Sequence, residues 1–299
     1  MLGGGATFAP GGKGANQAVA AARLGAEANI QVSMVGCVGD DDFGHTLKAT
    51  LNREGVHAES VRTAPEAPTG IAMITVDQTG ENIITVAPGA NREVGAQDVA
   101  ALGEAGELPS VLVISAEIPV PAILAALGGA NADRRPLTLV NLAPAPPKHD
   151  ALAILEGRPD WLVVNASEAA AILGRSVSGL ADAASAASDL VAAGARNAVV
   201  TAGAAGAAYH AATVTEISPR TVPSFPVQAR DTVGAGDTFV GALAVALAAG
   251  IDPAEAITAA SAAAATAATR PGTQTGMPRP ADIRAATGYE WPVTPAGER

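Results

Sequence analysis

From residue 91 onward, short apolar runs alternate with longer stretches whose apolar residues recur at helical spacing. The apolar runs cover residues 111–115, 137–140, 161–164 and 198–200. Strands that alternate with helices form parallel sheets, because a helix must return the chain before the next parallel strand begins. The pattern predicts an α/β fold of three layers, in which helices flank an open, mostly parallel sheet.

A different pattern occupies the stretch from residue 57 to residue 87. Two strand-like runs, at 70–76 and 83–86, are joined by a turn at 78–81, without helical periodicity between them. Two strands joined by a short turn pair antiparallel. We expect this segment to form a small antiparallel β lid over a site.

The most apolar predicted helix covers residues 239–250 and is apolar nearly all round, which is typical of a buried helix. Glycines at 234 and 236 precede it, so a ligand can approach the backbone closely. The free N–H groups at a helix start favour an anion such as phosphate. Asp237 lies on the same turn, where helix capping is the common role of an Asp. Two glycines and a second acid, Asp231, favour a role in chemistry instead.

Residues 11–18, which read GGKGANQA, open a second predicted helix. A Walker A phosphate loop does not fit, because Thr7 stands where its first glycine belongs and Gly14 follows Lys13 in place of Ser or Thr. A flexible linker does not fit either, because such linkers do not end in Lys-Gly-Ala-Asn-Gln at a helix start. We interpret the segment as a backbone cradle that presents Asn16 to a polar small molecule.

Polar and glycine residues follow four of the predicted strands where each strand ends. Parallel strands end at the same edge of a sheet, and ligands of open α/β sheets bind there. Taken singly, the two asparagines fit ordinary turns, but together the strand ends predict one crevice. The residues delivered to it are Glu117, Asn141, Asn165, Glu168, Thr201, Ala202, Gly203, Ala204, Ala205 and Gly206.

Composition excludes several classes of function. The 299 residues carry a net charge of -11 with a pI near 4.8, so a basic stripe for nucleic acid is lacking. Cys37 is the single cysteine, which excludes an intrachain disulfide and suggests the reducing cytoplasm. We find neither a signal-peptide pattern nor an apolar stretch long enough to span a membrane. The four histidines are scattered, which disfavours a zinc or serine hydrolase.

Two segments raise the question of a metal ion. Three adjacent acids at 40–42 fit a solvated helix cap better than a metal site. Residues 270–276 follow an alanine-rich helix and offer many carbonyl groups, which suits an alkali-metal ion. Ending a helix is the commoner role of such Pro and Gly residues.

The segments 11–18 and 231–237 together resemble the two signatures of the ribokinase-like (phosphofructokinase-B type) sugar kinases. They stand in the family's order, about 220 residues apart, and the likeness extends from about residue 11 to residue 285. The first signature and residues 269–274 are most similar to the ribokinase branch. The resemblance implies an ATP-dependent kinase that phosphorylates D-ribose at its 5-hydroxyl.

The resemblance also implies a role for each candidate residue. Asp237 would be the general base for the sugar's primary hydroxyl, and the N–H groups of Gly234, Ala235 and Gly236 would stabilise charge on the transferring phosphoryl group. Asn165 and Glu168 would lie near Mg²⁺-bound phosphates. Residues 201–206 and Gly236 would lie along ATP. The sugar would contact Gly12, Lys13, Gly14, Ala15, Asn16, Glu117 and Asp237.

By the same resemblance, a K⁺ ion would lie next to the anion site. Gly276 stands where the family supplies a serine ligand, which leaves that part of the shell incomplete. The remaining ligands would be the Asp231 side chain and carbonyl groups of Val233, Ala267, Arg270 and Gly272.

Family members carry a first strand, ending in an Asn/Asp pair, upstream of the Gly-Gly-Lys-Gly motif. Only ten residues precede that motif here, so we expect a truncated start and two exposed strand edges. We expect an α/β domain over 11–57 and 88–299, a β lid over 1–10 and 58–87, and a homodimer formed through the lid. The alternatives are a kinase for another sugar or a nucleoside, and a non-catalytic sugar or nucleotide sensor.

Overall fold

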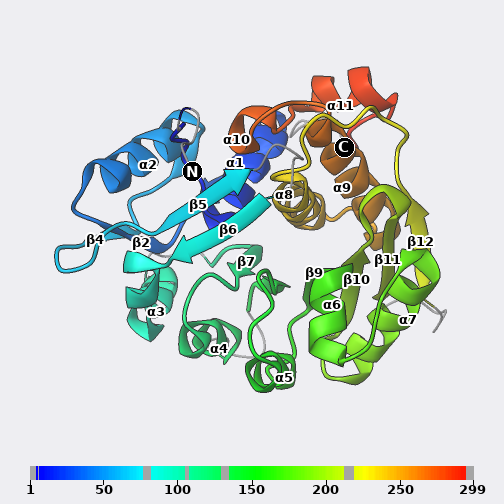
Figure 1. The fold of residues 1–299 in the computed structure, drawn as a ribbon, viewed down its shortest axis with the longest axis horizontal. Coiled ribbons are helices and arrows are strands. Elements are labelled where there is room, and N and C mark those ends of the chain that lie inside the picture. Colours follow the sequence, from blue (N-terminus) through cyan, green and yellow to red (C-terminus); the bar gives the residue numbers. More distant parts are fainter. Residues whose placement is uncertain are drawn as a thin grey trace.

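The computed structural model describes residues 5, 7–76, 82–104, 108–128, 135–211 and 219–293. The turn expected at 78–81 lies outside these residues. A central sheet lies between two helical layers, and a smaller β ribbon crosses the front of the molecule between α2 (Asp42–Arg53) and α8 (Ala235–Ala248) (Figure 1).

The central sheet confirms the mostly parallel arrangement predicted from the alternating pattern. Its strand order is β12-β11-β10-β9-β8-β7, with β7 to β10 parallel and β11 and β12 antiparallel at one edge. The strands are β7 (Val111–Ser115), β8 (Leu137–Asn141), β9 (Trp161–Asn165), β10 (Asn197–Thr201), β11 (Gly206–Ala211) and β12 (Arg220–Pro223).

Helices cover both faces of this sheet, because neighbouring strand residues point to opposite faces and both sets are apolar. Leu139 and Val163 face one layer, whereas Val140 and Val164 face the other. The first layer comprises α1 (Lys13–Gly25), α8 (Ala235–Ala248), α9 (Pro253–Ala268) and α11 (Pro280–Thr287). The second layer comprises α4 (Val120–Gly128), α5 (Lys148–Glu156), α6 (Ala166–Leu173) and α7 (Gly179–Ala192).

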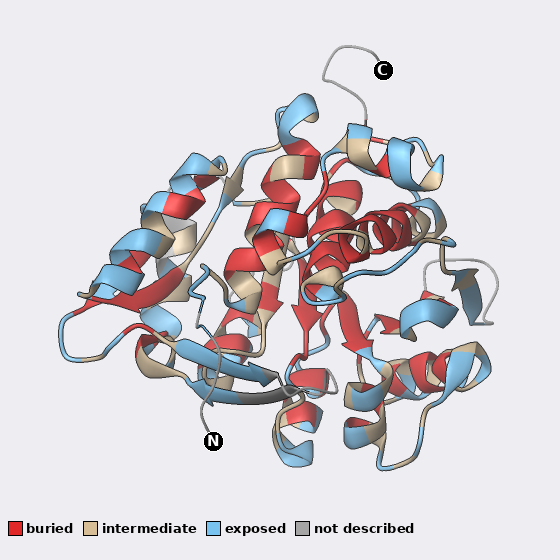
Figure 2. Ribbon diagram, turned by 45° about the horizontal axis from the view of Figure 1, so that its top comes forward, coloured by how far each residue is buried: buried red, intermediate tan, exposed pale blue. Residues whose placement is uncertain are grey.

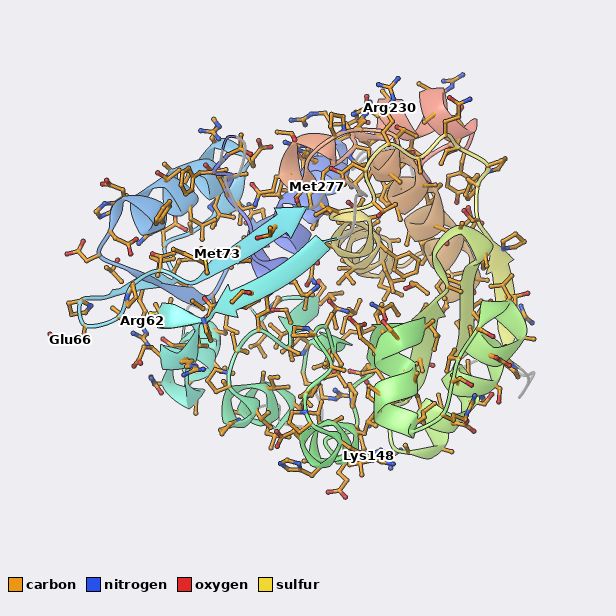
Figure 3. The ribbon with its side chains drawn as sticks, viewed as in Figure 1. Arg62, Glu66, Met73, Lys148, Arg230 and Met277 are labelled. Carbon is orange, nitrogen blue, oxygen red and sulfur yellow. The ribbon has the colours of Figure 1, made fainter. Side chains whose placement is uncertain are left out.

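The amino-terminal part of the chain forms two short parallel strand pairs, β1 with β3 and β2 with β4. Arg62 on β4 donates to Asp98 on α3 at 2.7 Å, which ties this part to the next helix (Figure 3). The elements are β1 (Val32–Ser33), β2 (Gly36–Gly39), α2 (Asp42–Arg53), β3 (Val56–His57), β4 (Val61–Ala64) and α3 (Ala96–Glu104), with short 3₁₀ turns at Ala26–Ala28, Gly89–Glu93 and Gly203–Ala205.

The expected antiparallel pair consists of β5 (Ile71–Val76) and β6 (Asn82–Ala87). Its described side chains are exposed on both faces (Figure 2), and Met73 projects from the ribbon (Figure 3). Two details differ from the predicted lid. β4, inside the 58–87 segment, pairs with β2 outside it, and residues 7–10 form no strand.

Helix α8 crosses α1 at very close range. Gly241 on α8 lies so near α1 that a methyl group there would lie 2.6 Å from the carbonyl oxygen of Gln17 and 2.8 Å from Cβ of Ala20. Such contact between backbones requires a glycine. The crossing brings the start of α1 against the start of α8, where both signature segments lie. Within the described ranges, no helix has the length and apolar character needed to cross a membrane.

Candidate active site

Asp237 lies on the first turn of α8, which begins after a glycine in the left-handed conformation. Gly234 has φ 82°, and a side chain there would also meet Thr273 at 2.8 Å. Glycine is therefore required both by conformation and by space. Helix α8 is buried along most of its length, and Asp237 is only 8% exposed. A carboxylate so buried needs hydrogen-bond donors around it.

Four buried amide side chains form the hydrogen-bond network around this carboxylate. Nδ2 of Asn16 donates to Oδ2 of Asp237 at 2.8 Å, and Nε2 of Gln17 donates to Oδ1 at 3.2 Å. Nε2 of Gln17 also donates to Oδ1 of Asn141 at 3.0 Å. Nε2 of Gln274 donates to Oδ1 of Asn16 at 3.1 Å. Both carboxylate oxygens are therefore held by α1.

The predicted anion-binding N–H groups differ in their availability. Ala235 donates its N–H to the carbonyl oxygen of Thr232 at 3.2 Å, within the turn that starts the helix. Gly234 and Gly236 have no backbone acceptor in the described part of the chain. These two N–H groups are the ones free to receive an anion at the positive end of α8.

Glu117 follows β7 in the sequence, and its side chain contacts the first residue of α1. Its Oε2 accepts the backbone N–H of Lys13 at 2.8 Å, and Gly12, with φ 88°, leaves room beside it. A negative side chain at a helix start is stabilised by the helix dipole. This contact occupies one carboxylate oxygen and ties the predicted sugar-binding motif to the edge of the sheet.

Asp237, Glu117 and Glu168 form one electrostatic group. Burial raises the pKa of Asp237, while the charge of Lys13 and the hydrogen bonds from Asn16 and Gln17 lower it. Burial likewise raises the pKa of Glu117 and of Glu168, and Lys13 opposes both shifts. Raised pKa values on clustered carboxyl groups are typical of sites that transfer protons.

Asn165 and Glu168 form a capping box at the start of α6. Oδ1 of Asn165 accepts the N–H of Glu168 at 2.8 Å, and Oε2 of Glu168 accepts the N–H of Asn165 at 2.8 Å. This reciprocal pair accounts for both residues structurally. A hollow of about 290 Å³ adjoins them. It lies between the start of α6, the start of α7 and the turn after β10. It is lined by Asn165, Ala166, Ser167, Gly179, Thr201, Ala202 and Gly203.

Ala204, Ala205 and Gly206 belong to the same turn but do not line this hollow. Gly206, with φ 115°, lets β12 approach closely, since a side chain would lie 2.1 Å from the carbonyl oxygen of Val222. Gly206 therefore shapes the turn, whereas residues 201–203 border the hollow.

Asp231 ties the segment before α8 to the loop after α9. Its Oδ1 accepts the N–H of Val233 at 3.0 Å and its Oδ2 the N–H of Gly272 at 2.8 Å. Near Gly276, the carbonyl oxygens of Arg270 and Ala267 converge, at 3.3 and 3.5 Å from where a Cβ would lie. The described residues contain no cluster of three or more acidic, His or Cys groups suited to a metal.

A larger hollow, of about 900 Å³, lies at the opposite end of the strands. It is lined by residues such as Arg158, Trp161, Arg196 and Asn197, and it holds none of the predicted site residues. The smaller hollow lies at the carboxyl ends of β9 and β10, and Gln17 links the buried Asp237 to Asn141 at the carboxyl end of β8. We therefore place the active site at the strand ends.

Comparison with known proteins agrees with this geometry. Residues 1–280 match the family described as pfkB family carbohydrate kinase. The chain belongs to this family. It is similar to the ribokinase of Schizosaccharomyces pombe, with 40% identity over 244 residues that cover 80% of this chain and 74% of that protein.

Solved structures of the family give the same result. The ribokinase of Thermotoga maritima has a TM-score of 0.77 and 32% identity, over 92% of this chain and 86% of the other. The Arabidopsis thaliana ribokinase complexed with ribose and ATP has a TM-score of 0.78 and 25% identity, over 94% and 88%. The chain is accordingly an ATP-dependent carbohydrate kinase with a ribokinase-like fold.

The sequence reasoning missed two members of the site, Gln17 and Gln274. Both are at least nine-tenths buried, and both belong to the hydrogen-bond network around Asp237. A signal was present in α1, where Asn16 and Gln17 interrupt a run of small apolar residues that face the core. Two adjacent amides on a buried helix surface need partners, and those partners define the site.

Proposed function

We propose that this kinase transfers the γ-phosphoryl group of ATP to the 5-hydroxyl of D-ribose, with Asp237 as general base. The observation that carries the proposal is the buried Asp237 carboxylate on the same helix turn as the free N–H groups of Gly234 and Gly236. A proton acceptor and an anion site on the same turn suit an in-line transfer from phosphate to hydroxyl.

In the proposed reaction, Asp237 takes the hydroxyl proton while the hydroxyl oxygen bonds to the γ-phosphorus. The bond from that phosphorus to the bridging oxygen breaks, and ADP leaves with the electron pair. The N–H groups at the start of α8 stabilise the charge on the transferred group. The backbone N–H of Lys13 occupies Oε2 of Glu117. Oε1 is the oxygen that remains to accept hydrogen bonds from sugar hydroxyls.

The residues present fit both expected ions. Glu168 would support Mg²⁺ through water, since its Oε2 already accepts a backbone N–H. Mg²⁺, when bound, neutralises charge on the phosphates. The convergent carbonyl groups of Ala267 and Arg270 and the Asp231 carboxylate would hold K⁺, an ion that prefers oxygen ligands. Gly276 contributes no side-chain ligand there.

The lid supports a proposal about assembly. Ile71, Met73, Ile74 and Val86 on β5 and β6 are exposed by 39%, 57%, 49% and 55%. Ile71 and Met73 lie on one face of the ribbon, and Ile74 and Val86 lie on the other. Exposed apolar side chains on adjacent strands are typical of an interface, and we propose that two lids pair in a homodimer. Analytical ultracentrifugation tests this, and a monomer at micromolar concentration would contradict it.

The deciding experiment measures ADP release with D-ribose, 2-deoxyribose, fructose and a nucleoside, with K⁺ and with Na⁺. We expect the highest kcat/KM for D-ribose and activation by K⁺. Asp237→Asn should lower kcat by about 10² to 10⁴ and leave ATP binding by calorimetry unchanged. Equal kcat/KM for a nucleoside would refute the choice of sugar. Near wild-type kcat in Asp237→Asn would refute the role of the base.

A further inference from the structure

The amides around Asp237 form a chain whose hydrogen bonds have a fixed direction. It begins at the backbone carbonyl of Val163 on β9, which can only accept, and Nδ2 of Asn141 donates to it at 3.0 Å. Oδ1 of Asn141 must then face Gln17, which donates through Nε2. Each amide orientation follows from the one before, because an amide nitrogen donates and an amide oxygen accepts.

Gln17 stands between this fixed chain and the carboxylate. Its Nε2 has two hydrogens, and both are used, one toward Asn141 and one toward Oδ1 of Asp237. Its Oε1 is buried and has no hydrogen-bond partner among the described residues. An unpaired buried carbonyl opposes folding. A Met side chain of similar length would fill the same space without the unpaired carbonyl, but it would leave Oδ1 of Asn141 and Oδ1 of Asp237 without this donor. These two hydrogen bonds, and not core packing, explain the glutamine.

We propose that Gln17 is a positioning residue for the general base: it fixes the Oδ1 edge of Asp237 relative to the strand ends. Asn16 fixes the opposite oxygen, supported by Gln274. With both oxygens held in place, the carboxylate cannot rotate, and its remaining lone pairs keep one direction for the sugar hydroxyl. This inference rests on the proposed role of Asp237 as base.

Other charged groups also act on Asp237. Lys13 on α1 stabilises the ionised carboxylate, while Glu117 after β7 and Glu168 on α6 are coupled to it as like charges. All three stay in place in a Gln17 variant. A change in pH dependence of such a variant therefore reports the loss of the Gln17 hydrogen bond.

The test compares pH profiles of kcat/KM for D-ribose in the wild type, Gln17→Met and Gln17→Glu. Gln17→Met removes one donor from the carboxylate, so the pKa of Asp237 rises. We expect the acid limb of the profile to move up by about one pH unit and kcat to fall about ten-fold. Gln17→Glu places a negative group against Oδ1 and should move the limb further in the same direction.

Val19→Ala is the matched control. Val19 lies on the same helix and is fully buried, but it packs with Val38, Leu51 and Val56 in a cluster that contains no residue of α8. It should lower the melting temperature and leave the acid limb unchanged. Gln17→Met removes the unpaired carbonyl but also leaves Oδ1 of Asn141 and Oδ1 of Asp237 without this donor, so its melting temperature should fall as well. The acid limb is therefore the measurement that distinguishes it from Val19→Ala.

The outcomes separate this inference from the proposed function. Failure of the wild type on D-ribose, or an active Asp237→Asn, overturns the function itself. If both of those behave as proposed while folded Gln17→Met and Gln17→Glu keep the wild-type acid limb and kcat, only the role of Gln17 is overturned. Should one of the two variants not fold, the other decides alone.

Discussion

Gly241→Ala is the substitution that most directly tests how the site is assembled. Gly241 lies one turn after Asp237 on α8, on the side that faces α1. An added methyl group would lie 2.6 Å from the carbonyl oxygen of Gln17 and 3.0 Å from the nitrogen of Ala21. Both contacts are with backbone atoms, which cannot swing away as a side chain can. The helices must therefore separate.

The magnitude follows from opposing effects. Overpacking a tight core typically costs about 1 to 3 kcal/mol, and replacing Gly by Ala inside a helix returns about 1 kcal/mol. The net loss of stability is therefore about 0 to 2 kcal/mol. The hydrogen bond from Gln17 to Asp237 is already 3.2 Å long, so a separation of a few tenths of an ångström weakens it first. A misplacement of about 1 Å at a catalytic group costs about 100-fold in rate, so a displacement of a few tenths of an ångström should lower the rate by up to about 10-fold.

The assay combines kcat/KM for D-ribose with a thermal unfolding curve of the same sample. Gly128→Ala is the matched control, because Gly128 ends helix α4 and has nothing within 4 Å of an added methyl group. We expect the control to keep its activity and its stability. For Gly241→Ala we expect kcat/KM to fall by the fold-change given above, while the free energy of unfolding falls by no more than about 2 kcal/mol. If Gly241→Ala matched the control in both measurements, the close crossing would not determine the site geometry.

Two further predictions concern pH. Burial raises the pKa of Glu117 above its value in the unfolded chain, so the ionised side chain destabilises the folded state as pH rises. Glu117→Gln should therefore have a higher melting temperature than the wild type at pH 8. This difference should shrink toward pH 4. A pH-independent difference would contradict this. Asp160 behaves oppositely: burial raises its pKa, but hydrogen bonds from Arg135 and Thr138 outweigh burial and lower it. Asp160→Asn should lower the free energy of unfolding, measured in urea at pH 7, by about 2 kcal/mol. The difference should disappear as pH falls below about 4, where the wild-type carboxylate becomes protonated. The kcat of this variant should stay unchanged, which serves as the control.

The sequence was sufficient for the features that repeat along the chain. Alternating apolar runs and helical stretches predicted the parallel sheet, because each crossover obeys the same local rule. The glycines before Asp237 marked the start of α8, since glycine adopts the left-handed conformation found at Gly234 more readily than any other residue. The order of strand ends likewise predicted which loops share one edge.

Features that depend on packing between distant segments could not be predicted. Gln274 lies 258 residues from Asn16, and its role exists only because the loop after α9 folds back onto α1. Asn165 and Glu168 read as ligands, yet the structure gives them a capping box, which a spacing of three residues also fits. The pairing of β4 with β2 depends on a crossover through α2 that periodicity does not indicate.

The way Asp237 is held explains why amides, not cations, surround it. A direct ion pair would fix the carboxylate but would also lower its affinity for the proton that a base must take. Neutral amides fix the same geometry with a smaller effect on that affinity, and burial acts in the opposite direction. Lys13 acts on Asp237 through its charge, with no hydrogen bond to it among the described residues. The site thus separates orientation, supplied by Asn16 and Gln17, from charge, supplied by the lysine and the start of α8.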